Sequence, residues 1–513
     1  MRTGHGACGW PPTNDWARSR HEHRRTAEGP PPEVADRARA ALASGSPARS
    51  TAHAVLRAVG DGAYANLELP RALRRARLDD RDAAFATELT YGTLRMQGFY
   101  DAIIVEATGR PTSRLDGGVL DVLRMGVHQV LAMRVPDHAA ADQAVGLARS
   151  VAGPGAAGLV NAVMRRVSES TAEEWRQRVV PAEPLAERLA IEHSHPVWIV
   201  KALRQALIGH GAATPQTADE AVAELLAAHN VPAPVSLVAR PGLAEVDDLL
   251  AAGAHPGRWS PFAAELDGGD PGSIEAVRDG RAAVQDEGSQ LLALALAAVP
   301  LADRDGDAPE QWLDLCAGPG GKAGLLAARA LEQGADLVAN EISDHRTELV
   351  RQTLRPALEA AEAAGRRLEV RTGDGRELGA DEPERYDRVL VDAPCTGLGA
   401  LRRRPEARWR RKPSDLVGLG PLQRELLVSA IEATRPGGVI AYATCSPHLS
   451  ETTFVVRDVL KKRDDVEQID ARELLDQVAT GDLTDLGDGP HAQMWPHIHG
   501  TDGMFLALLR KKP

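Results

Sequence analysis

Two cysteines in the C-terminal third of the chain have the sequence context of reactive thiols. Cys395 ends Asp392-Ala-Pro-Cys and Cys445 ends Ala443-Thr-Cys, and each motif follows a short apolar segment. A cysteine after Pro or Thr at the end of a strand is a poor packing residue, and its thiolate is a good nucleophile. We therefore predict that both thiols face a polar crevice, whereas burial in the core suits Cys316 better.

A glycine-rich segment, Asp314-Leu-Cys-Ala-Gly-Pro-Gly-Gly-Lys, precedes a helical pattern. Glycines let the backbone approach a ligand closely, and the first turn of a helix offers unpaired N–H groups. Gly318-x-Gly320-x-x-Ala323 fits the dinucleotide fingerprint, and Ala323 in place of Ser or Thr excludes a P-loop. The segment predicts a site for a nucleoside-containing cofactor, formed by Cys316, Ala317, Gly318, Pro319, Gly320, Gly321 and Lys322.

Three acidic residues follow predicted strands and extend this cofactor site. Glu341 comes about 20 residues after the glycines, where a carboxylate binds ribose hydroxyls, and Asp374 and Asp392 end later strands. Any one of them is equally well explained as a turn or helix-capping residue. Because acids after three successive strands line one edge of a sheet, we favour a ligand for the three together.

The elements that carry these residues alternate between strand and helix. The helical pattern covers Lys322–Gln333, and the predicted strands are Trp312–Cys316, Asp336–Ala339, Leu368–Arg371, Arg388–Val391 and Val439–Ala443. Such alternation predicts a Rossmann-like, doubly wound and mainly parallel sheet. We assign this α/β catalytic domain to residues 301–513.

The rest of the chain divides into three further segments. Residues 1–46 are rich in Pro and Arg without apolar periodicity, which predicts a disordered leader. Residues 47–167 carry helical stripes, for example Ala52, Val55, Leu56 and Val59, and predict an all-helical domain. Residues 168–300 mix helix and short strand signals and predict a connecting α+β domain.

Composition limits the class of protein. The 513 residues include 60 Lys+Arg and 72 Asp+Glu, so the net charge of −12 excludes a polycation and any nucleic-acid surface must be local. Four cysteines without a CxxC pair argue against a disulfide framework and structural zinc, so we expect no metal. Without an apolar run long enough for a membrane or a signal peptide, we expect a cytoplasmic protein, and nothing requires more than a monomer.

A basic segment begins seven residues after Cys395. Seven cations face one acid, Glu406, and Trp409 lies among them. In an acidic chain this concentration favours phosphate contacts and a base stacked on Trp409 over a solvated loop. The predicted RNA-binding residues are Arg402, Arg403, Arg404, Arg408, Trp409, Arg410, Arg411 and Lys412.

The motifs resemble those of a known family. Asp314-Leu-Cys-Ala-Gly-Pro-Gly-Gly-Lys, Asp392-Ala-Pro-Cys and Ala443-Thr-Cys-Ser are similar to the cofactor motif and the two cysteine motifs of S-adenosylmethionine-dependent RNA cytosine-5 methyltransferases of the NOL1/NOP2/Sun type. Thr90-Tyr-Gly-Thr-Leu-Arg and Asn161-Ala-Val-Met-Arg-Arg resemble the NusB-like, RNA-binding helical domain of the Sun-type branch, which modifies small-subunit ribosomal RNA.

The resemblance implies a function and roles for the site residues. It implies S-adenosylmethionine as cofactor and a cytosine of small-subunit (16S) rRNA, free or in a pre-ribosomal particle, as substrate. Cys445 is implied as the nucleophile on C6, Cys395 as the group for proton removal and release, and Asp392 as the contact to the cytosine edge. The same chemistry on transfer RNA or another rRNA cytosine is the main alternative, and a catalytically vestigial RNA-binding assembly factor is the second. A nicotinamide dehydrogenase fits the glycines but explains neither cysteine.

Overall fold

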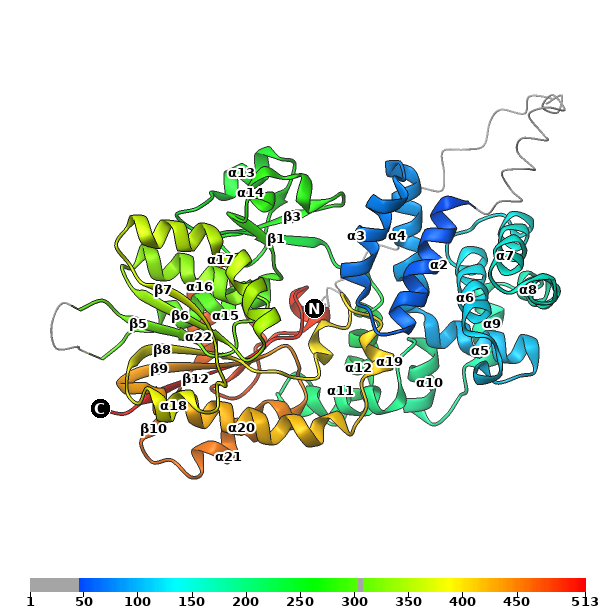
Figure 1. Cartoon of the computed structure of the whole chain (residues 1–513). Coiled ribbons are helices and arrows are strands. Elements are labelled where there is room, and N and C mark those ends of the chain that lie inside the picture. Colours follow the sequence, from blue (N-terminus) through cyan, green and yellow to red (C-terminus); the bar gives the residue numbers. More distant parts are fainter. Residues whose placement is uncertain (1–45, 303–307) are drawn as a thin grey trace, which may run out of the picture.

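The computed structural model describes residues 46–302 and 308–513. Residues 1–45 of the predicted leader lie outside the described part. A helical domain, drawn in blue and cyan in Figure 1, is followed by a connecting region in green and by a large sheet covered with helices. Among the described residues, no helix is both long and apolar enough to cross a membrane.

The helical domain forms because each of its helices buries one apolar stripe. Ala52, Val55, Leu56 and Val59 all lie in one core shared by the helices of this domain, as their spacing predicts. Capping residues fix some of the starts: the carboxylate of Asp116 accepts hydrogen bonds from the first N–H groups of α6. The helices are α2 (Pro47–Gly60), α3 (Ala65–Ala76), α4 (Asp80–Arg95), α5 (Gln97–Thr108), α6 (Gly117–Leu131), α7 (Asp137–Ala152) and α8 (Pro154–Ser168).

The connecting region combines helices with a small sheet. Its helices are α9 (Ala172–Val179), α10 (Leu185–Glu192), α11 (Val197–Gly209), α12 (Ala218–Ala228), α13 (Val246–Ala251) and α14 (Glu275–Arg278). The strands β1 (Val235–Ala239), β2 (His255–Pro256), β3 (Ala263–Leu266) and β4 (Ala282–Val284) pair antiparallel in the order β2-β3-β1-β4. Helix α15 (Glu287–Ala298) then leads into the large sheet.

The large sheet has the strand order β10-β12-β9-β8-β5-β6-β7, with β11 paired to β12. Its bounds are β5 (Gln311–Asp314), β6 (Asp336–Glu341), β7 (Leu368–Thr372), β8 (Tyr386–Asp392), β9 (Thr434–Thr444), β10 (Val466–Ile469), β11 (Ala492–Gln493) and β12 (Phe505–Lys511). The five predicted strands pair in parallel. The antiparallel pairs of β12 with β9, β10 and β11 are additional to the sequence prediction.

Helices cover both faces of this sheet because neighbouring strand residues point to opposite sides. On β8, Leu390 joins the core beneath α15, whereas Val389 and Val391 join the opposite core. The first face also carries α16 (Gly321–Glu332), α17 (Asp344–Ala363) and α22 (Ala471–Val478), and the second carries α18 (Leu378–Asp381), α20 (Asp415–Ala433) and α21 (Thr453–Leu460). The predicted fold class, a helical domain plus a doubly wound α/β domain, is confirmed.

Candidate active site

The glycine segment forms the turn between β5 and α16. Gly320 has φ of 113°, which L side chains rarely adopt, and a Cβ there would lie 2.8 Å from the side chain of Thr353. A Cβ on Gly318 would lie 2.3 Å from Glu341 Oε2. Both positions therefore require glycine, and the tight turn leaves the first N–H groups of α16 available to an anionic or polar ligand.

Glu341 ends β6 and Asp374 lies two residues after the end of β7, as the sequence predicts, but both carboxylates already have protein partners. Glu341 Oε2 accepts a hydrogen bond from Gly318 N at 3.1 Å and lies 3.3 Å from the guanidinium of Arg346. Arg376 binds the Asp374 carboxylate through Nε at 3.0 Å, and this hydrogen bond lowers the pKa of Asp374. The contacts of Arg346 and Arg376 were not predicted, because the sequence does not indicate which carboxylate an arginine will bind.

A buried charge cluster lies beneath the cofactor turn. Lys322 Nζ is 3.0 Å from Asp392 Oδ2, and this lysine is buried. Burial would lower the pKa of Lys322, but the charges of Asp392 and Cys445 outweigh it and the pKa is raised. Burial and then the charge of Asp392 raise the pKa of Asp314 to about 8. Asp314 Oδ2 has no hydrogen-bond partner among the described residues.

The two cysteines lie side by side. Cys395 Sγ is 3.4 Å from Cys445 Sγ, although 50 residues separate them in the chain, and both thiols are free. Either thiol can be the donor of the hydrogen bond between them. This hydrogen bond lowers the pKa of Cys445 against the effect of burial, with help from Lys322. The same hydrogen bond and burial raise the pKa of Cys395. One thiol is thus prepared to be a thiolate and its neighbour to hold a proton.

A carboxylate behind the cysteines joins their two loops. Glu451 is almost fully buried and accepts hydrogen bonds from Thr396 N at 2.8 Å, Thr396 Oγ1 at 2.5 Å and Ser446 Oγ at 2.6 Å. Thr396 and Ser446 each directly follow one of the two cysteines. Glu451 therefore connects the two loops that carry the thiols. Glu451 was not predicted from the sequence, because an acidic residue six positions after Cys445 belongs to no recognisable motif.

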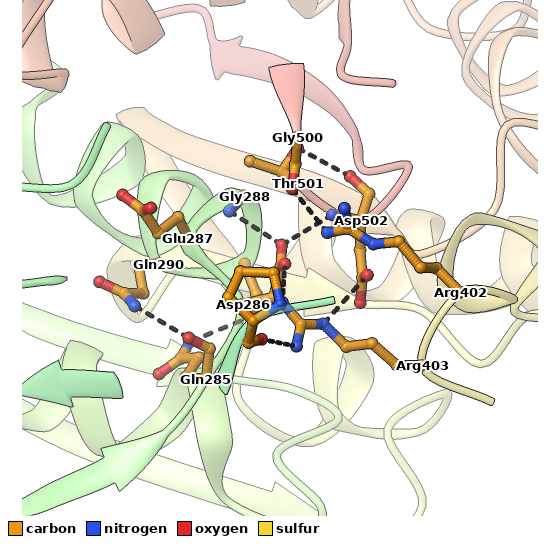
Figure 2. Close-up of polar contacts among 12 residues, drawn as sticks. Gln285, Asp286, Glu287, Gly288, Gln290, Arg402, Arg403, Gly500, Thr501 and Asp502 are labelled. Atoms are coloured by element: carbon orange, nitrogen blue, oxygen red, sulfur yellow. Dashed lines mark hydrogen bonds and ion pairs between the residues drawn. The ribbon is translucent and has the colours of Figure 1, made fainter. Parts of the chain in front are cut away.

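The structure contradicts the prediction that Arg402 and Arg403 of the basic segment contact RNA. Figure 2 shows Arg403 between two carboxylates, with Nη2 2.8 Å from Asp286 Oδ2 and Nε 3.2 Å from Asp502 Oδ1. Arg402 donates to the carbonyl of Gly500, and Arg403 also donates to the carbonyl of Pro234. These two guanidinium groups bind protein acceptors rather than facing solvent, so they are not available for phosphates.

Arg408 is a second correction, because its side chain is fully buried in α19 (Ala407–Arg410). Nη1 donates to the carbonyl of Arg95 at 2.9 Å and to Asn230 Oδ1 at 2.8 Å, and Nη2 donates to the carbonyl of His229 at 2.8 Å. Burial lowers the pKa of Arg408 to about 9. Arg408 joins the helical domain to the connecting region and does not contact RNA.

The remaining basic residues are more accessible. Arg404 and Lys412 are exposed, and Arg411 is half-buried, 4.0 Å from Asp415. Arg410 donates to the carbonyl of Val59 at 2.7 Å, and the guanidinium groups of Arg404 and Arg410 lie 5.8 and 5.3 Å from the ring centroid of Tyr64. Trp409 packs on α5, where a Cβ on Gly98 would lie 2.5 Å from the indole.

Two family models match separate parts of the chain. Residues 299–510 match the family model of 16S rRNA methyltransferase RsmB/F, and residues 46–169 match the NusB family. Rv1407 of Mycobacterium tuberculosis, which is named as a methyltransferase, is 48% identical over 470 residues, or 91% of this chain and 96% of that protein.

Two further relatives extend the comparison. The ribosomal RNA small subunit methyltransferase B of Thermus thermophilus is 35% identical over 421 residues, or 82% of this chain and 89% of that protein. The solved structure of PH0851 is 21% identical, with a TM-score of 0.72 over 91% of this chain and 99% of that one. At this identity the PH0851 structure supports the fold alone.

Proposed function

Since the chain belongs to the RsmB/F family of 16S rRNA methyltransferases, we propose that it transfers the methyl group of S-adenosylmethionine to C5 of one cytosine in small-subunit rRNA. The observation that carries the proposal is the pair of thiols 3.4 Å apart beside the Lys322–Asp392 ion pair. Half-buried thiols this close together are better suited to nucleophilic addition to a base, and to the later release of that base, than to packing in the core.

The residues around the glycine turn fit the cofactor. The two glycines allow a ligand to approach the backbone, and the unpaired Asp314 Oδ2 lies in the same cluster. The residues that would hold S-adenosylmethionine are Cys316, Ala317, Gly318, Pro319, Gly320, Gly321, Lys322, Glu341, Asp374 and Asp392. When bound, this cofactor supplies an electrophilic methyl group.

Cys445 begins the reaction in this proposal. C5 of cytosine is a weak nucleophile, and addition of the Cys445 thiolate to C6 moves the electrons of the C5–C6 double bond onto C5, which then takes the methyl group. The carboxylate of Asp392 accepts a hydrogen bond from the amino group on the cytosine edge and orients the base. If the target base is paired, it must first leave the helical stack.

Cys395 completes the cycle. Once Cys445 is bonded to C6, it no longer raises the pKa of Cys395, so the Cys395 thiol releases a proton to solvent. The resulting thiolate takes the proton from C5. The electrons of the C5–H bond restore the double bond, and the S–C6 bond breaks to return the Cys445 thiolate. One proton leaves per methyl group transferred, and the Cys395–Cys445 pair regains its single shared proton. The raised pKa of Cys395 suits a base that must hold the proton it has taken.

Bisulfite sequencing of total RNA from cells with and without the gene tests the proposal. We expect loss of one 5-methylcytosine from small-subunit rRNA. Loss from transfer RNA would overturn the substrate, and no loss at all would favour the assembly-factor alternative.

Two variants test the assigned roles of the thiols. Cys445→Ala should abolish methyl transfer, and wild-type turnover by this variant would refute the nucleophile. Cys395→Ala should accumulate a protein–RNA adduct that survives a denaturing gel, because it adds to C6 but cannot remove the C5 proton. Free turnover without an adduct would refute the role of Cys395.

A further inference from the structure

The connecting region places one arginine behind the cofactor turn. Arg240 directly follows β1 and is 1% exposed. Its Nη1 donates to the carbonyl of Gly280 at 2.7 Å and to the carbonyl of Thr353 in α17 at 2.6 Å. In Figure 1 the small sheet that carries Arg240 lies beside α17. Arg240 therefore joins the connecting region to a helix of the catalytic domain.

The guanidinium of Arg240 also lies against α16, the helix that follows the cofactor turn. A Cβ on Gly324 would lie 2.6 Å from Cζ of Arg240, so glycine at this position leaves the room that the guanidinium needs. Helix α16 starts at Gly321, which places Gly324 at the end of its first turn. The N–H groups of this turn are the ones available to a ligand. Arg240 thus packs directly behind the end of α16 that faces the proposed cofactor site.

A second connection to the cofactor turn runs through Thr353. Oγ1 of Thr353 donates to the carbonyl of Pro319 at 3.2 Å, and a Cβ on Gly320 would lie 2.8 Å from Cβ of Thr353. Arg240 binds the backbone of Thr353, and the side chain of Thr353 in turn binds the glycine segment. Arg240 therefore reaches the cofactor turn in two ways, through α16 and through α17.

The stability of the fold alone does not account for a cation at this position. Among the described residues, no carboxylate pairs with Arg240, and its Nε has no hydrogen-bond partner. Burial lowers the pKa of Arg240 to about 10, so the side chain is still charged at neutral pH. A buried charge is costly unless it is both paired and hydrogen-bonded, and Arg240 has hydrogen bonds alone. An apolar side chain could fill the same space at a lower cost, but it could not hold the carbonyls of Gly280 and Thr353 together.

We propose that Arg240 is a positioning residue for the cofactor, because it holds α16 and α17 in the arrangement that shapes the glycine turn for S-adenosylmethionine. Arg240 acts through Gly324 and Thr353, since its own side chain is buried behind the turn. The proposal rests on the proposed function, because it assumes that this cofactor binds at the turn. It gives the connecting region a share in the affinity for the cofactor.

Binding of S-adenosylhomocysteine to the full chain without RNA tests the proposal, because this compound lacks the transferred methyl group and its binding is measured without turnover. Arg240→Met keeps the length of the side chain and removes its charge and its donors. We expect Arg240→Met to bind about tenfold more weakly, because the turn is no longer held. Arg240→Lys keeps the charge and one donor group and should stay within about threefold of the wild type. In methyl transfer, Arg240→Met should raise KM for S-adenosylmethionine and leave kcat at saturating cofactor within about twofold of the wild type.

Arg388→Met is the matched control. Arg388 is 5% exposed, and its Nη1 also donates to two carbonyls, those of Leu296 and Val299, at 2.8 and 2.7 Å. It pairs with Trp312 near the start of β5, whereas the cofactor turn follows the end of that strand. Arg388→Met should therefore lower the unfolding temperature and leave the affinity for S-adenosylhomocysteine unchanged.

The proposal is wrong if Arg240→Met binds S-adenosylhomocysteine as tightly as the wild type does. It is also wrong if Arg388→Met weakens binding as much as Arg240→Met, because both then act through general stability. If Arg240→Met does not fold, Thr353→Val decides, since it removes only the hydroxyl that binds Pro319. About threefold weaker binding by Thr353→Val would support the proposal, and wild-type affinity would overturn it.

The same measurements separate this proposal from the proposed function. If the wild type binds S-adenosylhomocysteine but methylates no cytosine, the proposed function fails, and the affinities of the variants still decide the role of Arg240. If the wild type does not bind S-adenosylhomocysteine, the cofactor is wrong and both proposals fail. If the wild type binds and methylates RNA while Arg240→Met keeps full affinity, only the role of Arg240 fails.

Discussion

Replacing Glu451 with Gln tests whether this residue sets the geometry of the thiol pair. Gln keeps the shape and one acceptor, so Thr396 N retains a partner. The hydrogen bonds from Thr396 Oγ1 and Ser446 Oγ, at 2.5 and 2.6 Å, lose their charged acceptor. A hydrogen bond to a charged group exceeds a neutral one by about 1 kcal/mol. We therefore expect Glu451→Gln to lose about 2 kcal/mol, which corresponds to about a 30-fold lower kcat if the loss falls on the transition state.

The assay separates positioning from general damage. The kcat and KM for the RNA are measured together with the thermal unfolding of the variant. The charge of Glu451 raises the pKa of Cys395, so Glu451→Gln should shift alkylation of that thiol to lower pH. Glu425→Gln on α20 is the matched control, since Glu425 is half-exposed and pairs only loosely with Arg376, at 3.4 Å.

Two results would contradict the role given to Glu451. If kcat, KM and unfolding are all those of the wild type, the Glu451 network does not hold the loops. If kcat falls while the pH dependence of Cys395 alkylation stays unchanged, the lower kcat is not caused by a change in the thiol pair.

Two further predictions concern charges away from the thiols. Asp286→Asn should lower kcat and the unfolding temperature but leave RNA affinity unchanged, because Arg403 then loses a charged partner that holds the segment after Cys395. Asp314 has a pKa of about 8 in the folded protein and 3.8 as its reference, so the folded state holds its proton more tightly and stability falls as pH rises from about 4 to 8. Asp314→Asn should remove this fall in unfolding temperature.

One outcome would contradict each of these two predictions. Weaker RNA binding by Asp286→Asn would mean that Arg403 contacts RNA after all. For Asp314→Asn, unfolding of the cofactor-free protein at pH 5 and pH 8 is compared with the wild type. If the unfolding temperature of Asp314→Asn still falls between pH 5 and pH 8 as in the wild type, a group other than Asp314 causes the pH dependence.

Local sequence patterns were sufficient to predict the parallel part of the sheet and the proximity of the two cysteines. Strand and helix alternate with clear turn residues there, and the ends of parallel strands meet at one edge. Cys395 and Cys445 therefore had to lie near each other, and they are 3.4 Å apart. The antiparallel strand β12 was not predicted, because a continuous apolar run such as Phe505–Leu509 does not distinguish strand from helix.

Three residues of the basic segment, Arg402, Arg403 and Arg408, contradict the prediction of RNA contacts for a different reason. Composition shows that cations are concentrated but not which acceptors they meet. The acceptors of Arg408 are mainly backbone carbonyls, for example that of Arg95, 313 positions away in the chain. Every residue type carries such a carbonyl, so the sequence has no signal for this contact.

The position of β12 has a consequence for synthesis of the protein. This strand follows every other strand of the sheet in the chain, yet it lies between β9 and β10. Until the ribosome has released it, β9 has an unpaired edge and β10 has no neighbour in the sheet, although the helical domain is already free to fold. Nascent chains should therefore pass through a stage with an open, apolar strand edge, which is prone to aggregation. Chaperone demand should therefore be highest after β10 has been made and should fall when this single strand joins the sheet.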